Sequence, residues 1–435
     1  METPGAPKHI GKYEVIKALG RGATAAVYLA TDGFDRRQYA IKLAHADTLR
    51  DPEHGARYKK QFFNEAFLAG TLRHPHIVAL HDAVVDEHMS YLVMEYVGGG
   101  TLKNFCTPER LLPIDYVLDI AFKCCGALAY AQTQGVIHRD IKPANILLES
   151  DSYTDIKLSD FGAALLAHSD ATQVAGLIGS PSYMSPEQVK EQPLDFRSDM
   201  FSLGAVLYEL LTGHLAFPGE NHFSIAYKIA NEPPPPLTQY RADIPRTVTD
   251  IVARALEKDP ARRFASWQAF SQAIRDAAAP AATTAQQTIR DMEKFDTLRR
   301  LPFFKSFTDA ELWETLAIAQ WGRFERNTLL LREGDYGQSF FILAKGEVRV
   351  LKGDKLIDII KPGACFGEMA YLDQAARPAR SASVISETDV VLVKIRAGRL
   401  NEASRDLQLR FNQVFIQTLL SRLNATNRRW SLLQV

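Results

Sequence analysis

The sequence has few cysteines and no long apolar run, and these shortages narrow the classes of protein it can encode. Its 435 residues include four cysteines, too few and too irregularly spaced for a disulfide framework or a zinc ribbon. No segment reaches the roughly 18 uninterrupted apolar residues that a membrane span requires. The nearest, residues 201–217, carries Glu209 and His214 and is interpreted as a buried helix. The N-terminus lacks the apolar core of a signal peptide, so we expect a cytoplasmic protein with no membrane partner.

Charge of one sign is also lacking, because 51 Lys and Arg residues balance 51 Asp and Glu residues. This balance argues against a polybasic nucleic-acid binder, so we expect no nucleic-acid partner. An apolar content of 46% argues against intrinsic disorder. The length is enough for about two or three domains of roughly 150 residues, each with its own hydrophobic core.

One change of composition divides the chain. Residues 276–287 read DAAAPAATTAQQ, small and almost uncharged, which is typical of a linker. Before it, strand-like segments are followed by mostly helical sequence. After it, short β-type runs between glycines, flanked by helical stretches at residues 309–317 and 407–423, indicate a small β-barrel or roll. The β-type runs are residues 328–331, 339–343, 347–351, 356–360 and 390–395. We therefore expect an α+β protein of more than one domain.

A glycine-rich loop lies between two strand-like segments near the N-terminus. Residues 19–27 read LGRGATAAV and contain Gly20 and Gly22. Glycines let a hairpin lie against phosphates, because backbone N–H groups can point at the anion with no side chain in the way. Taken alone, a plain β-turn is the simpler interpretation. Dinucleotide-binding folds use a similar pattern, but there a helix follows the loop, whereas here a strand follows.

A lysine ends the next apolar strand-like segment. Lys42 closes Tyr39-Ala40-Ile41-Lys42, and a lone lysine in such a place is usually solvated. The helix-like residues 59–72 carry Glu65 among mostly apolar neighbours, where an unpaired carboxylate would be costly. An ion pair between Lys42 and Glu65 would satisfy both charges and would aim the ammonium at the α- and β-phosphates of a nucleotide.

Two further motifs narrow the choice: residues 137–145, IHRDIKPAN, and residues 158–162, LSDFG. They resemble the catalytic loop and the metal-binding loop of eukaryotic-like (bacterial-type) Ser/Thr protein kinases, and their combination in this order is specific. The resemblance covers about residues 10–277. It implies a bilobal protein kinase fold, with a small lobe over residues 10–96 and a large lobe over residues 97–277.

The resemblance also implies a role for each polar residue of these motifs. Asp140 accepts or orients the substrate hydroxyl proton, and Lys142 lies beside the transferred phosphate. Asn145 and Asp160 hold Mg²⁺ or Mn²⁺. The lysine two positions after the aspartate is the pattern of Ser/Thr kinases, so the expected substrates are ATP and the Ser or Thr hydroxyls of proteins. The residues implied to bind ATP are Gly20, Arg21, Gly22, Ala25, Val27, Ala40, Lys42, Glu65, Met94, Glu95 and Tyr96.

Other positions follow the order of the same family. Met94-Glu95-Tyr96 resembles the hinge that receives adenine. The resemblance implies that Asp199 is buried and anchors the catalytic loop, and that Glu187 pairs with Arg263. Ser185 stands where alanine is commoner in the family.

An arginine beside the catalytic carboxylate suggests regulation by phosphorylation. Arg139 directly precedes Asp140 and is well placed to bind a phosphorylated residue of the activation segment. The candidates are Ser169, Thr172 and Ser180. We expect autophosphorylation at Thr172, whereas Ser180 is better suited to positioning substrate.

A second resemblance begins after the linker, which is predicted at residues 278–289. Residues 366–370, FGEMA, and residues 380–383, RSAS, follow several regularly placed glycines in β-rich sequence. They resemble the cyclic-nucleotide-binding domain. The resemblance implies a β-roll or jelly roll with flanking helices over residues 290–430.

This resemblance implies how the second region would hold a ligand. A short helix after Gly367 points backbone N–H groups at a cyclic phosphate, Arg380 pairs with the phosphate oxygens, and Glu368 accepts from the ribose 2′-hydroxyl. The alternative is a solvated glutamate and arginine in a surface loop, and cAMP versus cGMP stays open. The residues of this nucleotide cassette are Gly367, Glu368, Met369, Ala370, Arg380 and Ser381.

Together the two resemblances predict a Ser/Thr protein kinase regulated in cis by a cyclic nucleotide, with ATP and protein substrates as partners. Two alternatives stay open. The second domain could be a docking or dimerisation module with an empty pocket, and the kinase would then be constitutive. A dimerisation module would make the protein a homodimer. The chain could also be a non-catalytic scaffold that senses nucleotide, although the presence of Lys42, Asp140 and Asp160 argues against it.

Overall fold

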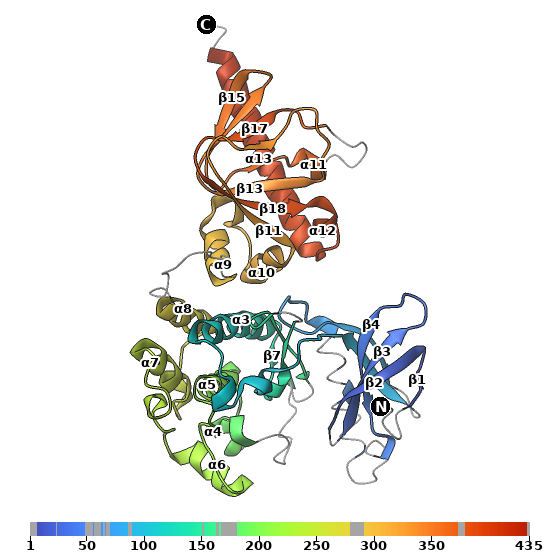
Figure 1. Ribbon diagram of the computed structural model, residues 1–435, viewed down its shortest axis with the longest axis vertical. Coiled ribbons are helices and arrows are strands. Elements are labelled where there is room, and N and C mark those ends of the chain that lie inside the picture. The colour runs from blue at the N-terminus through green and yellow to red at the C-terminus, as the bar shows by residue number, and fades with distance from the viewer. Residues whose placement is uncertain are drawn as a thin grey trace. The chain divides into compact units, whose positions relative to one another are not determined.

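The computed structural model divides the chain into two compact units, residues 1–285 and residues 286–435 (Figure 1). Each unit is described by itself. The predicted linker falls almost wholly outside the described residues. The structure describes residues 7–22, 24–47, 55, 62–63, 66, 70–85, 89–149, 152–161, 165–166, 181–278, 291–372 and 379–432.

The first unit opens with a six-stranded antiparallel sheet in the order β1-β2-β3-β4-β6-β5. Branched and aromatic residues form its core, where Ile41 and Val93 face each other on adjacent strands and are both fully buried. The strands are β1 (His9–Ile10), β2 (Tyr13–Arg21), β3 (Ala25–Asp32), β4 (Gln38–Ala44), β5 (Leu80–Val85) and β6 (Ser90–Glu95). This sheet holds the glycine-rich loop and Lys42.

Helices dominate the rest of the first unit, and α5 (Phe196–Thr212) is its central one. Every residue from Ser198 to Thr212 is buried, which confirms the buried helix predicted there. Gly213 ends the helix with a φ of 75°, and a Cβ at that position would lie 2.5 Å from the backbone N of Pro108. The other helices are α3 (Ile114–Thr133), α4 (Pro186–Val189), α6 (His222–Asn231), α7 (Arg246–Ala255) and α8 (Trp267–Ala278).

Two short strand pairs in the helical part support the loops that carry the motifs. Strands β7 (Val136–Ile137) and β10 (Leu165–Leu166) form one pair, and β8 (Ile146–Leu148) and β9 (Ile156–Leu158) form the other. The first motif lies between β7 and β8, and the second motif begins at the end of β9. Across the described parts of the chain, no helix combines the length and apolar character needed to cross a membrane.

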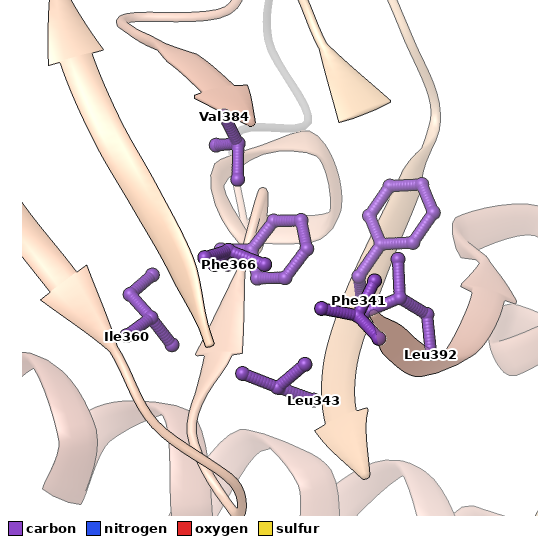
Figure 2. Close-up of a cluster of buried hydrophobic side chains, with 8 residues drawn as sticks. Phe341, Leu343, Ile360, Phe366, Val384 and Leu392 are labelled. Carbon is purple, nitrogen blue, oxygen red and sulfur yellow. The ribbon is translucent and has the colours of Figure 1, made fainter. Parts of the chain in front are cut away.

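The second unit contains two four-stranded antiparallel sheets, in the orders β11-β18-β13-β16 and β12-β17-β14-β15. Both sheets contribute to one hydrophobic core, in which Phe341, Leu343, Phe366 and Leu392 come from the first sheet and Ile360 and Val384 from the second (Figure 2). The strands are β11 (Ala319–Phe324), β12 (Leu329–Leu331), β13 (Ser339–Lys345), β14 (Val348–Lys352), β15 (Lys355–Ile360), β16 (Cys365–Phe366), β17 (Ser383–Ser386) and β18 (Val390–Arg396).

Helices flank this roll on the sequence, as predicted. The flanking helices are α9 (Asp291–Arg300), α10 (Asp309–Ile318), α12 (Ala397–Asn401) and α13 (Arg405–Leu432), whereas the short α11 (Met369–Leu372) lies between β16 and β17. The longest of them, α13, packs against α10 and α12. A protein kinase-like unit followed by a β-roll with flanking helices is the fold class expected from the sequence, and it is confirmed.

Candidate functional site

The loop that carries Asp140 is fixed to the central helix α5 by a buried carboxylate. The backbone N–H groups of His138 and Arg139 donate to the two carboxylate oxygens of Asp199, each at 2.8 Å. Burial raises the pKa of Asp199, although both hydrogen bonds favour its charged form. Arg139 takes a φ of 68°, a left-handed conformation that these two bonds hold in place. The predicted anchoring role of Asp199 is confirmed.

Two side chains of the first motif converge on one carboxylate oxygen of Asp140. Lys142 donates from Nζ to Oδ2 of Asp140 at 2.7 Å. Asn145 donates from Nδ2 to the same oxygen at 3.0 Å and to the backbone O of Asp140 at 2.8 Å. Because both side-chain donors use Oδ2, a hydroxyl can approach Oδ1 of Asp140 without displacing either of them.

The strand lysine meets the aspartate of the second motif. Lys42 lies on β4, opposite Val27 on β3 and Leu92 on β6, and its Nζ is 2.7 Å from Oδ1 of Asp160. Burial of Asp160 opposes its ionisation, but the charge and the hydrogen bond of Lys42 outweigh burial and lower the pKa to about 2. Glu65, the partner expected for Lys42, lies outside the described residues, so that pair stays a prediction.

The two expected metal ligands are brought together by the β8–β9 hairpin. Its register pairs Ile146 with Leu158, and the backbone N–H of Ser159 donates to the backbone O of Asn145 at 2.9 Å. Asn145 and Asp160 therefore flank the same end of the hairpin. Amide and carboxylate oxygens are the ligands that Mg²⁺ and Mn²⁺ prefer, so these residues fit a hard divalent cation. Within the described residues, no group of three or more His, Cys, Asp or Glu residues forms a metal site of its own.

The glycine-rich loop is a tight hairpin between β2 and β3. The backbone N–H of Gly22 donates to the backbone O of Ala25 at 2.8 Å, and Gly20 faces Val27 across the pair. A Cβ at Gly20 would meet no atom within 4 Å, so packing within the protein does not require glycine there. A glycine at this position is instead suited to close approach of a ligand to the backbone. Arg21 ends β2 and is exposed.

The segment expected to receive adenine lies at the end of β6. Met94 pairs with Ala40 on β4, and Ala40 is buried. Glu95 forms an ion pair with Lys157, in which Oε1 of Glu95 lies 3.0 Å from Nζ of Lys157. Oε2 of Glu95 accepts from the backbone N–H of Ala79 at 3.2 Å. Both carboxylate oxygens of Glu95 therefore have partners within the protein. Tyr96 directly follows the strand and is half-buried.

The predicted phosphorylation sites Ser169, Thr172 and Ser180 lie outside the described residues and stay predictions. After them, the chain is anchored by a buried ion pair, since Arg263 donates to Oε1 and Oε2 of Glu187 at 2.7 and 2.8 Å. This confirms the predicted pair.

Ser185 has a local reason to replace the commoner alanine. Its hydroxyl accepts from the backbone N–H of Gln188, and the side-chain oxygen of Gln188 accepts from the backbone N–H of Ser185. These two bonds form a capping box at the start of α4.

In the second unit, Arg380 of the nucleotide cassette is held by backbone carbonyls. Its guanidinium donates to the O of Gly367 at 3.1 Å and to the O of Ser339 at 2.7 Å. Burial lowers the pKa of Arg380, and the nearby Glu368 opposes that shift. A Cβ at Gly337 would lie 2.6 Å from Nη2 of Arg380, and a Cβ at Gly367 would lie 2.9 Å from Nη1. Two glycines therefore make the space that the guanidinium occupies.

The rest of the cassette surrounds the start of a short helix. The helix expected after Gly367 is present as α11, where the N–H groups of Tyr371 and Leu372 bond to the O of Glu368. Met369 is about half exposed and Ser381 is exposed. The backbone of Ala370 lies within α11, and its side chain is outside the described part of the structure.

Glu368 has a partner that the sequence analysis did not identify. Nη1 of Arg422 on α13 is 2.6 Å from Oε1 of Glu368, and Nη2 of Arg422 donates to the O of Cys365. The carboxylate expected to accept from a ribose hydroxyl is thus engaged by the terminal helix. A signal was present in the sequence: Arg422 lies eleven positions after Phe411 and seven after Phe415, which places all three on one helical face.

Comparison with known proteins assigns each of the two units to a different domain family. Residues 13–274 match the model of the protein kinase domain, and residues 321–406 match that of the cyclic nucleotide-binding domain. The serine/threonine-protein kinase PknB of Mycobacterium leprae is 37% identical over 265 residues, covering 59% of this chain and 42% of that protein. PrkC of Bacillus subtilis is 37% identical over 268 residues, covering 61% of this chain and 40% of that protein. The chain thus spans less than half the length of these relatives.

Proposed function

We propose, on the premise that this chain belongs to the protein kinase domain family, that it transfers the γ-phosphate of ATP to Ser or Thr hydroxyls of proteins. The observation that carries the proposal is the convergence of Lys142 and Asn145 on Oδ2 of Asp140. The names of its relatives, all serine/threonine-protein kinases, support the same acceptor. Because ATP is the donor, we place the activity in the cytoplasm.

The residues divide the work of the transfer. Asp140 orients the acceptor hydroxyl through Oδ1 and takes its proton as the new O–P bond forms and the bond between the β- and γ-phosphates of ATP breaks. Lys142, already beside Asp140, neutralises charge on the phosphoryl group in transit. Lys42 leaves Asp160 in part to contact the α- and β-phosphates. Mg²⁺ or Mn²⁺, held by Asn145 and Asp160, supplies further charge neutralisation between the phosphates when bound.

The test is a phosphotransfer assay on the whole chain. Purified protein is incubated with γ-labelled ATP, Mg²⁺ and a basic protein acceptor, beside an Asp140→Asn variant. We expect label on the acceptor and on the chain itself, as phosphoserine or phosphothreonine in acid hydrolysates. Incorporation no greater than that of Asp140→Asn would favour the scaffold alternative. Phosphotyrosine as the main product would contradict the proposed acceptor.

Autophosphorylation is tested separately at the activation segment. Mass spectrometry of wild type after incubation with ATP should find phosphate on Thr172, with Ser169 and Ser180 as the other candidates. A Thr172→Ala protein should have lower activity than wild type. If Thr172→Ala retains full activity and wild type loses none after phosphatase treatment, this part of the proposal is wrong.

A second proposed function is regulation in cis by cAMP or cGMP bound to the roll. It is favoured by the glycine-lined position of Arg380, since a half-buried guanidinium that donates to two backbone carbonyls can be offered to a phosphate. Isothermal titration with each nucleotide on wild type and Arg380→Ala tests binding, and kinase rates with and without nucleotide test regulation. Binding lost in Arg380→Ala, with a changed kinase rate in wild type, is expected. No binding by wild type would favour a docking or dimerisation module and a constitutive kinase.

A further inference from the structure

The terminal helix of the second unit contacts the nucleotide cassette through a single arginine. Arg422 on α13 bonds to Oε1 of Glu368 and to the O of Cys365, the residue that opens β16. The side chain of Glu368 is 6% exposed and that of Arg422 is 41% exposed. A carboxylate so deeply buried requires a partner, and in this structure a partner comes from fifty-four positions further along the chain.

Aromatic packing holds α13 in the position from which Arg422 reaches the cassette. Phe411 and Phe415 are fully buried on the same face of α13 as Arg422. The ring of Phe415 lies 5.1 Å from that of Phe340 on β13 and 5.9 Å from that of Tyr371 on α11. Since α11 follows directly after Glu368, the helix that supplies the arginine packs on the element that carries its carboxylate partner.

We propose that Arg422 is a latch that sets the affinity of the roll for a cyclic nucleotide. In this proposal, which rests on the nucleotide binding proposed above, Arg422 covers a carboxylate that is only 6% exposed, so the ribose 2′-hydroxyl reaches Glu368 only when the guanidinium moves away. The pair must open before the ribose is bound, and opening frees the part of α13 that follows Phe415. The latch is defined as the contacts of Arg422 with Glu368 and Cys365.

The thermodynamic consequence follows from a two-state equilibrium. If only the unlatched state accepts ribose, the apparent dissociation constant equals the intrinsic one divided by the unlatched fraction. A hydrogen bond to a charged group is worth a factor of about ten or more in such an equilibrium, and the partial exposure of Arg422 places the expectation at the lower end. Removing the arginine should therefore tighten nucleotide binding about tenfold.

The same helix offers a matched control. Arg410 on α13 also pairs with a buried glutamate, its Nε lying 3.1 Å from Oε1 of Glu311 on α10, whose side chain is 9% exposed. Both are Arg–Glu pairs whose arginine lies on α13. They differ in the position of the glutamate, because Glu311 belongs to a flanking helix and Glu368 to the cassette. Arg410→Ala therefore reports the general effect of losing a helix-anchoring arginine.

The experiment is isothermal titration of the whole chain with cAMP and with cGMP, on wild type, Arg422→Ala, Arg410→Ala and Arg380→Ala. We expect Arg422→Ala to bind about tenfold more tightly than wild type, Arg410→Ala to stay within about twofold, and Arg380→Ala to lose binding. Circular dichroism checks that each variant is folded, and Arg422→Gln replaces Arg422→Ala if the latter is not.

The outcomes separate the latch from the binding function itself. Equal or weaker binding by Arg422→Ala, with intact binding by wild type, overturns the latch and leaves nucleotide binding in place. No binding by wild type or by Arg422→Ala overturns both. Binding by Arg422→Ala alone supports both, because the latch then keeps the wild-type site closed.

Hydrogen exchange gives a second readout that a merely structural arginine would not produce. Saturating nucleotide should speed amide exchange after Phe415 in wild type, and Arg422→Ala should exchange fast there without nucleotide. Exchange in this part of α13 that nucleotide leaves unchanged, in a protein that demonstrably binds it, would overturn the release of the helix.

Discussion

In both candidate sites the charged side chains form ion pairs within the protein, but the pairing residues come from the site itself in one case and from a distant helix in the other. In the first unit, Lys42 pairs with Asp160 and Lys142 pairs with Asp140, and all four residues are expected to act on the same nucleotide and acceptor. In the second unit, Glu368 pairs with Arg422, which belongs to the terminal helix. A ligand can enter the first site by inserting between groups that it then contacts. At the second site, as we propose, it must displace Arg422 of the terminal helix.

This difference separates a site built for chemistry from one built for coupling. Groups that all contact the substrate can be positioned before it arrives, which is how an enzyme avoids reorganisation during the reaction. When a paired group belongs to another element, occupancy of the site depends on the position of that element. A ligand can then shift the equilibrium between two positions of the element. Loss of a paired group should therefore have opposite effects at the two sites: Asp140→Asn should lower activity in the first, and Arg422→Ala should tighten nucleotide binding in the second.

The largest expected effect is in the catalytic site. Asp140→Asn should lower the phosphotransfer rate about 100- to 10,000-fold, because the amide cannot take the acceptor proton. The measurement is initial rate at saturating ATP and acceptor, with binding of an ATP analogue as the control for an intact site. If Asp140→Asn kept more than about a tenth of the wild-type rate, the pairing in the first site would not serve proton transfer.

The buried ion pair of Arg263 with Glu187 lies outside both candidate sites, so its loss measures the effect of breaking a buried pair on stability alone. Arg263→Ala should lower the free energy of unfolding by about 3–5 kcal/mol, since it leaves the Glu187 carboxylate buried without its cation. Chemical denaturation measures this. The matched control is Arg246→Ala, whose pair with Asp250 is exposed at both ends and 3.9 Å long, and which should cost no more than about 1 kcal/mol. Equal losses in the two variants would contradict the role given to burial.

The same contrast explains what could be predicted from the sequence. Asp140, Lys142, Asn145 and Asp160 occur in two short motifs, and the resemblance of these motifs to the catalytic and metal-binding loops of protein kinases implies that they act together. The fold class followed from glycine-separated β-type runs, which match five strands of the roll.

Contacts between distant elements could not be predicted in this way. The pair of Lys42 with Glu65, which lies outside the described residues, stays a prediction, and the contact of Lys42 with Asp160, 118 positions away, was not predicted. Arg422 was missed because its shared helical face with the buried Phe411 and Phe415, which directs it to the roll, was not used in the prediction. Strand β11 was missed since its sequence, AQWGRF, lacks clear alternation of apolar and polar residues.

A capping box chosen from each unit allows a smaller test of how independently the two regions respond. Ser185 caps α4 with Gln188 in the first unit, and Thr308 caps α10 with Glu311 in the second. Each Ser or Thr to Ala change should cost about 1 kcal/mol of local stability. Peptide-resolved hydrogen exchange should place the loss from Ser185→Ala in the first unit and that from Thr308→Ala in the second. A loss that appears in both units from either change would show that they are energetically coupled.

The smallest expected effect concerns acid stability of the Lys42–Asp160 pair. Because the pKa of Asp160 is lowered to about 2 in the folded state, its contribution to stability is full above the unfolded value of roughly 3.9 and is lost as pH falls toward 2. Lys42→Met removes the main contribution that opposes burial, so the pKa of Asp160 rises and the loss begins at higher pH. The shift should be small, since 41% of the Asp160 side chain is exposed to solvent.

The measurement is the pH midpoint of acid unfolding, followed by circular dichroism in wild type, Lys42→Met, Asp160→Asn and the double variant. Lys42→Met should raise the midpoint more in the wild-type background than in the Asp160→Asn background, because the titrating carboxylate is absent from the latter. An equal rise in both backgrounds would mean that Lys42 stabilises the first unit through contacts other than Asp160. The first site would then depend, like the second, on a partner outside its own ligand-binding groups.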